Sequence, residues 1–220
     1  MVADQAAGSW RRVGVLGGTF DPVHVGHLII AQEVLARLGL DGMLFVPARI
    51  SPFKREAQAA PAEDRVAMLE LALQDEPRFR VSRVDLDRPA PSFTVDTLRI
   101  LHQRLGGESE LTFVMGADSL ATFAEWRAPG EILRLARLAG VTRPGTPLDL
   151  AALRAALPSI EERTDLVEGV EVGISATDIR QRVAAGEPIR FQVPPLVERY
   201  IARHGLYRTP TAPSSHPPCC

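Results

Sequence analysis

The stretch GGTFDPVHVGHL, residues 17–28, carries the residue types most suited to binding a phosphorylated ligand. Gly17 and Gly18 have no Cβ, so their backbone N–H groups can approach a phosphate closely. His24 and His27 are three residues apart, and near a helix start this spacing places both side chains on one side. The helix N-terminus adds a partial positive charge. We therefore predict an anion-binding site at this stretch.

The residue types alone leave other interpretations open. With Asp21, the two histidines could hold zinc, although the HExxH pattern of zinc enzymes is missing. They could also be helix-capping or core residues. Gly26, between them, leaves room for a bulky ligand. A dinucleotide-binding fingerprint is excluded, because Gly14, Gly17 and Gly18 do not have the GxGxxG spacing.

Lys54 is a second candidate, because the other 24 of the 25 basic residues are arginines. A lone lysine can mark a place where a flexible point charge is needed and a planar guanidinium cannot replace it. The alternative is that it is simply left over from a drift toward arginine. Lys54 follows Ser51-Pro52-Phe53 and not a glycine loop, which excludes a Walker A site.

Alternating apolar patterns indicate the elements that must position these residues. Strands are expected at residues 11–16, where Gly17 and Gly18 break the first, and at 43–46, 79–84, 111–115, 138–142 and 167–172. Helices are expected at residues 28–38, 62–74, 95–105, 119–126, 131–135 and 150–156, and from residues 175 and 195 onward. Gly39 is expected to cap the first of these helices, and Gly205 to end the last. Such alternation is typical of an α/β fold with a mostly parallel sheet. Ligands of such sheets bind outside the carboxyl ends of the strands, where strand order reverses.

Composition narrows the class of protein. A chain of 220 residues with 45% hydrophobic residues can bury a core, and no run is long enough for a membrane span. The net charge of −2 argues against a general polyanion-coating protein. No secretory signal is visible, and the only cysteines are Cys219 and Cys220, so no internal disulfide or cysteine-based zinc site is expected. A cytoplasmic protein fits these features.

The chain is divided into residues 1–10, a loose lead-in, residues 11–208, one domain, and residues 209–220, a Pro/Ser-rich tail expected to be disordered. The terminal Cys219-Cys220 pair resembles a prenylation end, but we favour a dangling tail.

Several motifs together resemble one known family. GGTFDPVHVGHL is similar to the HxGH motif of the nucleotidylyltransferase superfamily and, more narrowly, to the nicotinate-nucleotide adenylyltransferases. Four further segments occur in that family's order: VPARISPFK (46–54), PSFTVDTL (91–98), GADSL followed by Trp126, and ISATDIR (174–180) followed by VPPLVERYIARHGLY. The resemblance covers about Arg11 to Tyr207.

This resemblance implies a Rossmann-like, doubly wound α/β fold with a mostly parallel sheet and a C-terminal helical segment. It implies transfer of AMP from ATP to nicotinic acid mononucleotide, giving deamido-NAD and pyrophosphate in NAD biosynthesis. The partners are then these two small molecules, without nucleic acid or membrane, and Mg²⁺ arrives with ATP rather than at a protein metal site. The oligomeric state is left open.

The resemblance also assigns roles to individual residues. The catalytic set is His24, His27, Lys54 and Arg180. The ATP-binding set is Gly17, Gly18, Thr19, Phe20, Ser175 and Thr177. The acceptor-binding set is Ser92, Phe93, Thr94, Gly116, Asp118, Trp126 and Arg143. The family often has Tyr at Phe93 and Ser at Ala176, so hydroxyl contacts are not expected at those two positions.

Two of these assignments have structural alternatives. Ser175-x-x-Asp178 is also a helix-capping box, which is compatible with an anion site. Trp126 could equally be a partly buried core aromatic. For the whole protein, the alternatives are another adenylyl- or cytidylyltransferase of the superfamily and a non-catalytic regulator that binds pyridine nucleotides. The PSFTVDTL and GADSL segments argue against the first, and the complete set of phosphate-binding residues argues against the second.

Overall fold

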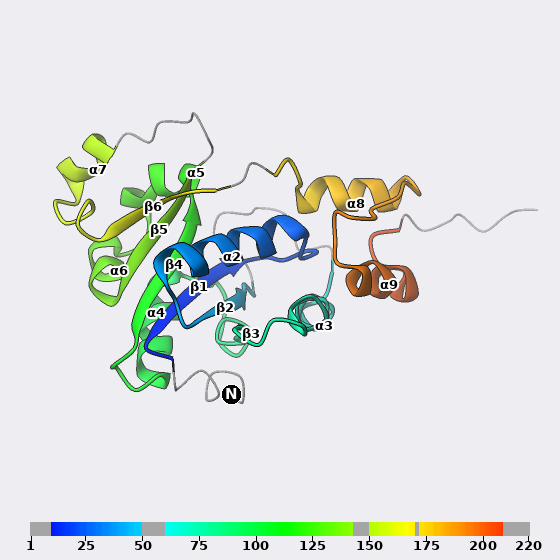
Figure 1. Ribbon diagram of the computed structural model, residues 1–220, viewed down its shortest axis with the longest axis horizontal. Helices are drawn as coiled ribbons and strands as arrows, with labels where there is room; N and C mark the ends of the chain where they lie inside the picture. Colours follow the sequence, from blue (N-terminus) through cyan, green and yellow to red (C-terminus); the bar gives the residue numbers. More distant parts are fainter. Residues whose placement is uncertain (1–9, 50–59, 143–149, 170–171, 209–220) are drawn as a thin grey trace, which may run out of the picture.

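A six-stranded parallel sheet forms the centre of the protein, seen in a computed structural model that describes residues 10–49, 60–142, 150–169 and 172–208. The strands lie in the order β3-β2-β1-β4-β5-β6. Their bounds are β1 Arg12–Gly18, β2 Gly42–Pro47, β3 Phe79–Val81, β4 Glu110–Gly116, β5 Ala136–Thr142 and β6 Thr164–Glu168. All five strand pairings are parallel, which confirms the predicted Rossmann-like α/β fold (Figure 1).

Helices pack on both faces of this sheet, in two separate apolar clusters. One cluster takes its helical side chains from α2 (Val25–Leu38), α3 (Ala62–Leu73), α8 (Ala176–Ala184) and α9 (Pro195–His204). The other takes them from α4 (Thr94–Arg104), α5 (Ala117–Ala121), the 3₁₀ turn η1 (Phe123–Glu125), α6 (Pro129–Leu135) and α7 (Leu150–Ala156). The central strands β1, β2, β4 and β5 place alternating side chains in both clusters, as burial on two faces requires, whereas the outer strands β3 and β6 contribute only to the first cluster.

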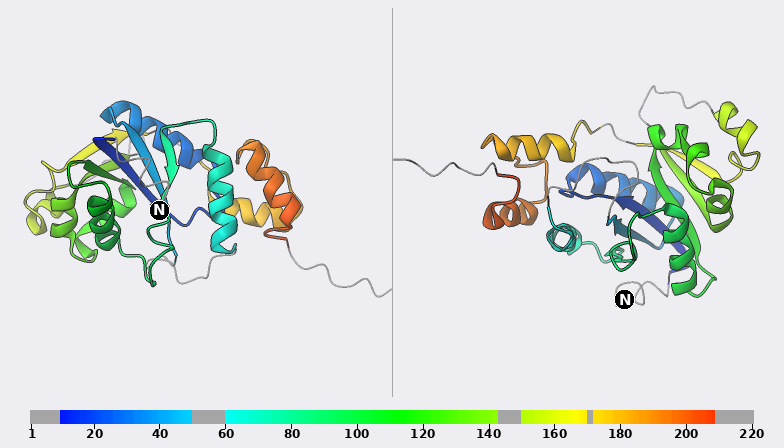
Figure 2. Two further views of the ribbon diagram at one scale, coloured as in Figure 1. Left: turned by 90° about the horizontal axis from the view of Figure 1, so that it is seen from below. Right: turned by 180° about the vertical axis from the view of Figure 1, so that it is seen from behind.

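The C-terminal helices α8 and α9 extend beyond the sheet on the side of α3, and α9 lies beside α3 in both figures (Figures 1 and 2). Gly205 ends α9 in a left-handed conformation, with φ of 63°, and Leu206 N–H donates to the Ile201 carbonyl. Gly39 ends α2 in the same manner, with φ of 58°. Both glycine helix ends were predicted, and both are confirmed.

Several predicted boundaries are wrong. β1 continues through Gly17 and Gly18, which pair with Val46 and Pro47 of β2, so the glycines extend the strand instead of breaking it. Helix α2 begins at Val25, three residues before the expected start. In β3, pairing ends at Val81 although Val84 is buried.

The expected strand at residues 167–172 lies earlier in the chain, at Thr164–Glu168. Only Val167 of its five side chains is buried, because β6 is an edge strand. The first residues of β6 are polar and show no apolar alternation, so in the sequence they resemble a loop. Tertiary contacts fix the pairing instead: Arg137 on β5 holds Asp165 in a bidentate ion pair of 2.9 and 3.0 Å.

The order of the strands reverses between β1 and β4. On one side of β1 lie β2 and then β3, in chain order. The next strand, β4, pairs with the opposite side of β1. The carboxyl ends of β1 and β4 therefore leave a crevice, the position at which open α/β sheets bind ligands. No helix in the described ranges is long and apolar enough to cross a membrane.

Candidate active site

A cavity of about 530 Å³ opens at this crevice and brings together residues from both predicted binding groups. The ends of β1 and β4 form its floor, and the starts of α2, α4 and α5 contribute to its walls. Nine predicted site residues line it: Gly17, Gly18, Thr19, His27, Ser92, Thr94, Gly116, Asp118 and Trp126. They come from distant parts of the sequence, so only the fold makes them neighbours.

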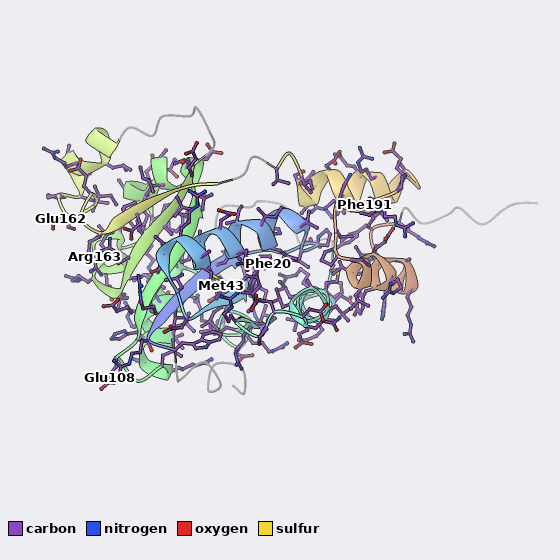
Figure 3. All side chains as sticks on the ribbon, viewed as in Figure 1. Phe20, Met43, Glu108, Glu162, Arg163 and Phe191 are labelled. Atoms are coloured by element: carbon purple, nitrogen blue, oxygen red, sulfur yellow. The ribbon has the colours of Figure 1, made fainter. Side chains whose placement is uncertain are left out.

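Gly17 and Gly18, the last two residues of β1, differ in how much room a side chain would have. A Cβ on Gly18 would lie 3.0 Å from the ring of Phe20, so a larger residue there would crowd the buried Phe20 ring. A Cβ on Gly17 would make an ordinary 3.6 Å contact with the Phe113 ring. Phe20 itself does not line the cavity. It is buried next to α2 (Figure 3), and the centroids of its ring and of the His27 ring lie 4.9 Å apart in an edge-to-face arrangement.

His27 is oriented by the backbone at the start of α2. The His24 backbone N–H donates to His27 Nδ1 at 3.2 Å, so Nδ1 must carry a lone pair and no hydrogen. The hydrogen of the neutral ring is then on Nε2. His27 therefore presents an N–H donor from a ring that lines the cavity.

His24 has a different environment from His27. Its side chain is buried, and its ring stacks on His27 with centroids 3.7 Å apart. Burial lowers the pKa of His24 to about 4, so the ring is neutral at physiological pH. A Cβ on Gly26 would lie 3.0 Å from His24 Nδ1. Gly26 thus makes room for the His24 ring, and not for a ligand as the sequence suggested.

A buried network of charged and polar groups supports the side of the cavity that carries the predicted acceptor-binding residues, called the acceptor side below. Asp85 lines the cavity, accepts a hydrogen bond of 2.6 Å from Thr97 and forms an ion pair of 2.8 Å with Arg88. Arg88 also donates to the Phe93 carbonyl at 3.1 Å. Burial raises the pKa of Asp85, while Thr97 and Arg88 oppose the rise. The network fixes the segment that leads into α4.

Ser92, Phe93 and Thr94 lie at the start of α4, and they point in different directions. Ser92 and Thr94 line the cavity, and Ser92 Oγ accepts from the Arg49 backbone N–H at 3.1 Å. The Phe93 ring is covered by the guanidinium of Arg127 at 4.6 Å. The first N–H groups of α4 have no partner within the helix, so its N-terminus favours an anion.

Trp126 combines the two roles that were considered for it. Its ring contacts Phe113 at 6.0 Å and Phe123 at 5.6 Å, so it belongs to the edge of the core. It also lines the cavity and is only partly buried. Gly116 and Asp118 lie nearby, at the end of β4 and in the first turn of α5.

The start of α8 holds the remaining described residues of the catalytic and ATP-binding sets. Ser175 is the N-cap, and its Oγ accepts from the Asp178 backbone N–H at 3.0 Å, which is one half of the predicted capping box. The Asp178 carboxylate instead accepts from Arg182 Nε at 3.2 Å. Ser175 and Thr177 are exposed. Arg180 is partly buried and donates to the backbone carbonyl of Asp21 at 2.7 Å, which connects α8 to the loop before α2.

Two predicted residues, Lys54 and Arg143, lie outside the described residues, as do Cys219 and Cys220. Sequence reasoning also missed several supporting residues. Arg65 is 1% exposed and donates to the Thr19 carbonyl at 2.6 Å. Asp85 was missed because no local pattern distinguishes a buried aspartate from a surface one. Within the described ranges, no group of three or more His, Cys, Asp or Glu side chains could hold a metal ion.

Comparisons with known proteins identify the family of this chain. The cytidylyltransferase-like family model matches residues 15–182. A protein from Roseiflexus sp. (strain RS-1), named "Probable nicotinate-nucleotide adenylyltransferase", is 50% identical over 196 residues, which cover 89% of this chain and 98% of that protein. A protein of the same name from Thermomicrobium roseum is 48% identical, covering 90% of this chain and 92% of its own length.

Solved structures show the same fold at low sequence identity. The Plasmodium falciparum nicotinic acid mononucleotide adenylyltransferase complexed with NaAD has a TM-score of 0.70 at 17% identity. The match covers 90% of this chain and 97% of that one. The family model and the relatives together establish that the chain belongs to the cytidylyltransferase-like family and, within it, to the nicotinate-nucleotide adenylyltransferases.

Proposed function

We propose that the chain transfers the AMP moiety of ATP to the 5′-phosphate of nicotinic acid mononucleotide, giving deamido-NAD and pyrophosphate. A phosphate oxygen of the mononucleotide attacks the α-phosphorus of ATP, and the bond from that phosphorus to the bridging oxygen of the β-phosphate breaks. The nucleophile is already an anion, so the reaction needs little general-base catalysis. Positioning and charge stabilisation supply most of the rate enhancement.

The observation that carries this proposal is the single cavity between the start of α2 and the start of α4. His27 Nε2–H serves as a donor to the phosphates of ATP, and the neutral His24 ring supports it by stacking. Thr19, Gly17 and Gly18 line the same wall. Phe20 fixes this wall from the core.

The start of α8 supplies a second group of phosphate ligands. Ser175 and Thr177 lie exposed in its first turn, and Arg180 is held beside the loop that leads to His24. Lys54 and Arg143 complete the phosphate-binding set in this proposal. Mg²⁺ enters bound to the ATP phosphates, and Asp118 offers a carboxylate oxygen of the kind that Mg²⁺ accepts directly or through water.

The nicotinate group binds on the other side of the cavity. Trp126 provides an aromatic face, and the N-terminus of α4 provides backbone N–H donors for the carboxylate. With nicotinamide, an NH₂ group would face those donors and leave both sides unsatisfied. An unsatisfied buried polar group costs about 1–3 kcal/mol. We therefore expect a preference for the nicotinate form of roughly tenfold to several hundredfold in kcat/KM.

Pyrophosphate release, measured with Mg-ATP and a panel of acceptors, tests the proposal. The panel contains nicotinic acid mononucleotide, nicotinamide mononucleotide and phosphopantetheine, with CTP in place of ATP as a further arm. We expect turnover with ATP and a preference for the nicotinate acceptor, and Trp126→Ala should weaken both mononucleotides while leaving their ratio unchanged. Turnover with phosphopantetheine or CTP instead indicates another superfamily activity. Binding without turnover indicates a regulator.

A further inference from the structure

Asp21 joins three segments that are far apart in the sequence. Its side chain is 3% exposed, and Oδ1 accepts hydrogen bonds from Tyr207 Oη at 2.8 Å and from the Ala60 backbone N–H at 3.2 Å. Its backbone carbonyl accepts from Arg180 Nη1 at 2.7 Å. Tyr207 and Asp21 are 186 residues apart, so this contact ties the C-terminal turn to the loop between β1 and α2.

The segments that meet at Asp21 carry most of the proposed catalytic residues. Asp21 itself is three residues before His24, and Arg180 belongs to α8. Ala60 follows residues 50–59, the stretch in which Lys54 occurs. A shift of Asp21 would therefore move the loop before α2 relative to Arg180.

Backbone conformation on both sides of this contact is strained. Phe20, adjacent to Asp21, has φ of 48°, and Tyr207 has φ of 64°. Left-handed conformations are unfavourable for bulky residues and persist only where the surrounding contacts hold them. Such strain is found most often at functional sites. Here it lies at the two ends of one hydrogen-bonded connection.

The charges around Asp21 keep this connection intact. Burial raises the pKa of Tyr207, and the neighbouring Asp21 carboxylate raises it further, so the phenol remains a proton donor at physiological pH. Arg65, buried beside Asp21 and Tyr207, donates to the Thr19 carbonyl at 2.6 Å. The loop is therefore held by its carbonyls at Thr19 and Asp21 and by the Asp21 carboxylate.

We propose that Tyr207 and Asp21 are positioning residues for adenylyl transfer, whose hydrogen bond fixes the loop before α2 so that His27 and Arg180 address the same phosphate groups. The inference rests on the proposed function, because it assigns a catalytic purpose to the connection. Neither residue lines the cavity, so both act through the residues they hold. Small displacements of catalytic groups are costly, since a shift of about 1 Å can lower the rate about a hundredfold.

The chain offers a matched control for the test. Its only other tyrosine, Tyr200, donates to Asp64 Oδ1 at the same 2.8 Å, between α9 and α3 and away from the cavity. We compare Tyr207→Phe with Tyr200→Phe, well below the melting temperature of each. We expect Tyr207→Phe to lower kcat about tenfold, with little change in KM for the mononucleotide. Tyr200→Phe should retain the wild-type kcat.

A second variant and a second measurement separate this inference from the proposed function. Asp21→Asn keeps an oxygen that can accept from Tyr207, so it should retain more activity than Tyr207→Phe. In NMR spectra of the imidazole groups, Tyr207→Phe should shift the resonances of His24 and His27, and Tyr200→Phe should not. The NMR measurement needs no turnover, so it tests the Tyr207–Asp21 connection even in an inactive protein. Absence of pyrophosphate release by the wild type would overturn only the proposed function.

Two results would overturn the positioning role. One is an active wild type for which Tyr207→Phe and Tyr200→Phe give the same kcat. The other is a set of His24 and His27 resonances that Tyr207→Phe leaves unchanged. Both tyrosine variants could also lose thermal stability while the folded proteins have equal kcat. That result would likewise overturn the positioning role, because the Tyr207–Asp21 hydrogen bond would then support only the fold.

Discussion

The two sides of the cavity are held in different ways. On the acceptor side, the buried carboxylate of Asp85 is surrounded by its partners Thr97 and Arg88, and the segment that enters α4 is bonded to them. The predicted nucleotide-binding residues, called the nucleotide side here, are held less uniformly. His24 is buried and neutral, while Ser175 and Thr177 at the start of α8 are exposed, and none of these three lines the cavity itself. The acceptor side is therefore assembled in advance, whereas part of the nucleotide side is in contact with water.

This difference suggests how each side contributes to the reaction. An assembled pocket selects its ligand by what its fixed donors can satisfy, so the acceptor side should control specificity. The nucleotide side should control rate, because its donors face charge that develops on the phosphates. Variants on the two sides should accordingly change different kinetic constants.

The largest effect is expected at His27. Removal of its imidazole in His27→Ala should lower kcat by on the order of 10²–10³, the usual loss for a donor that stabilises a transition state. The ring is only partly buried, so the fold should remain intact. His204→Ala, at the end of α9, serves as the control for loss of a histidine. Near-normal turnover of purified His27→Ala would contradict the expectation that the nucleotide side controls the rate.

The buried, neutral state of His24 predicts a pH dependence of stability. Its pKa is about 4 in the folded chain against 6.5 in the unfolded chain, so the unfolded state binds more protons between these values. The free energy of unfolding should therefore fall as the pH is lowered from about 6.5 to 4. The total contribution of this group is on the order of 3 kcal/mol.

Urea unfolding of the wild type and His24→Gln at several pH values between 7 and 4.5 measures this contribution. The variant should lose stability less steeply toward acid than the wild type, whatever its stability at pH 7. If His24→Gln and the wild type have parallel pH profiles, His24 is not the buried neutral group described above.

The smallest effect is expected on the acceptor side. Thr97→Val keeps the shape of the side chain but removes the hydroxyl that donates to Asp85, a bond worth about 0.5–1.5 kcal/mol. We expect a severalfold rise in KM for nicotinic acid mononucleotide and an unchanged KM for ATP. Thr112→Val in β4, which does not line the cavity, is the control. Equal changes in both KM values would contradict the division of labour between the two sides.

Much of the fold could be predicted because its signals are local. Helix ends at Gly39 and Gly205 depend on a left-handed conformation that glycine adopts without strain. The apolar runs of β2 and β4 mark strands that are buried on both faces. Prediction failed at β6, where an edge strand has one buried side chain, and at Gly17 and Gly18, where pairing with β2 overrides the preference of glycine for turns.

The sequence by itself determined which residue types were available for chemistry: two histidines three apart at a helix start, a serine cap on α8 and an aromatic ring after β4. Tertiary structure alone decided how they are held. Asp21 meets Tyr207, 186 residues away, and the low pKa of His24 arises because the surrounding side chains exclude water. Hydrogen-bond partners and desolvation depend on which segments pack together, and a local pattern of residue types does not determine that packing.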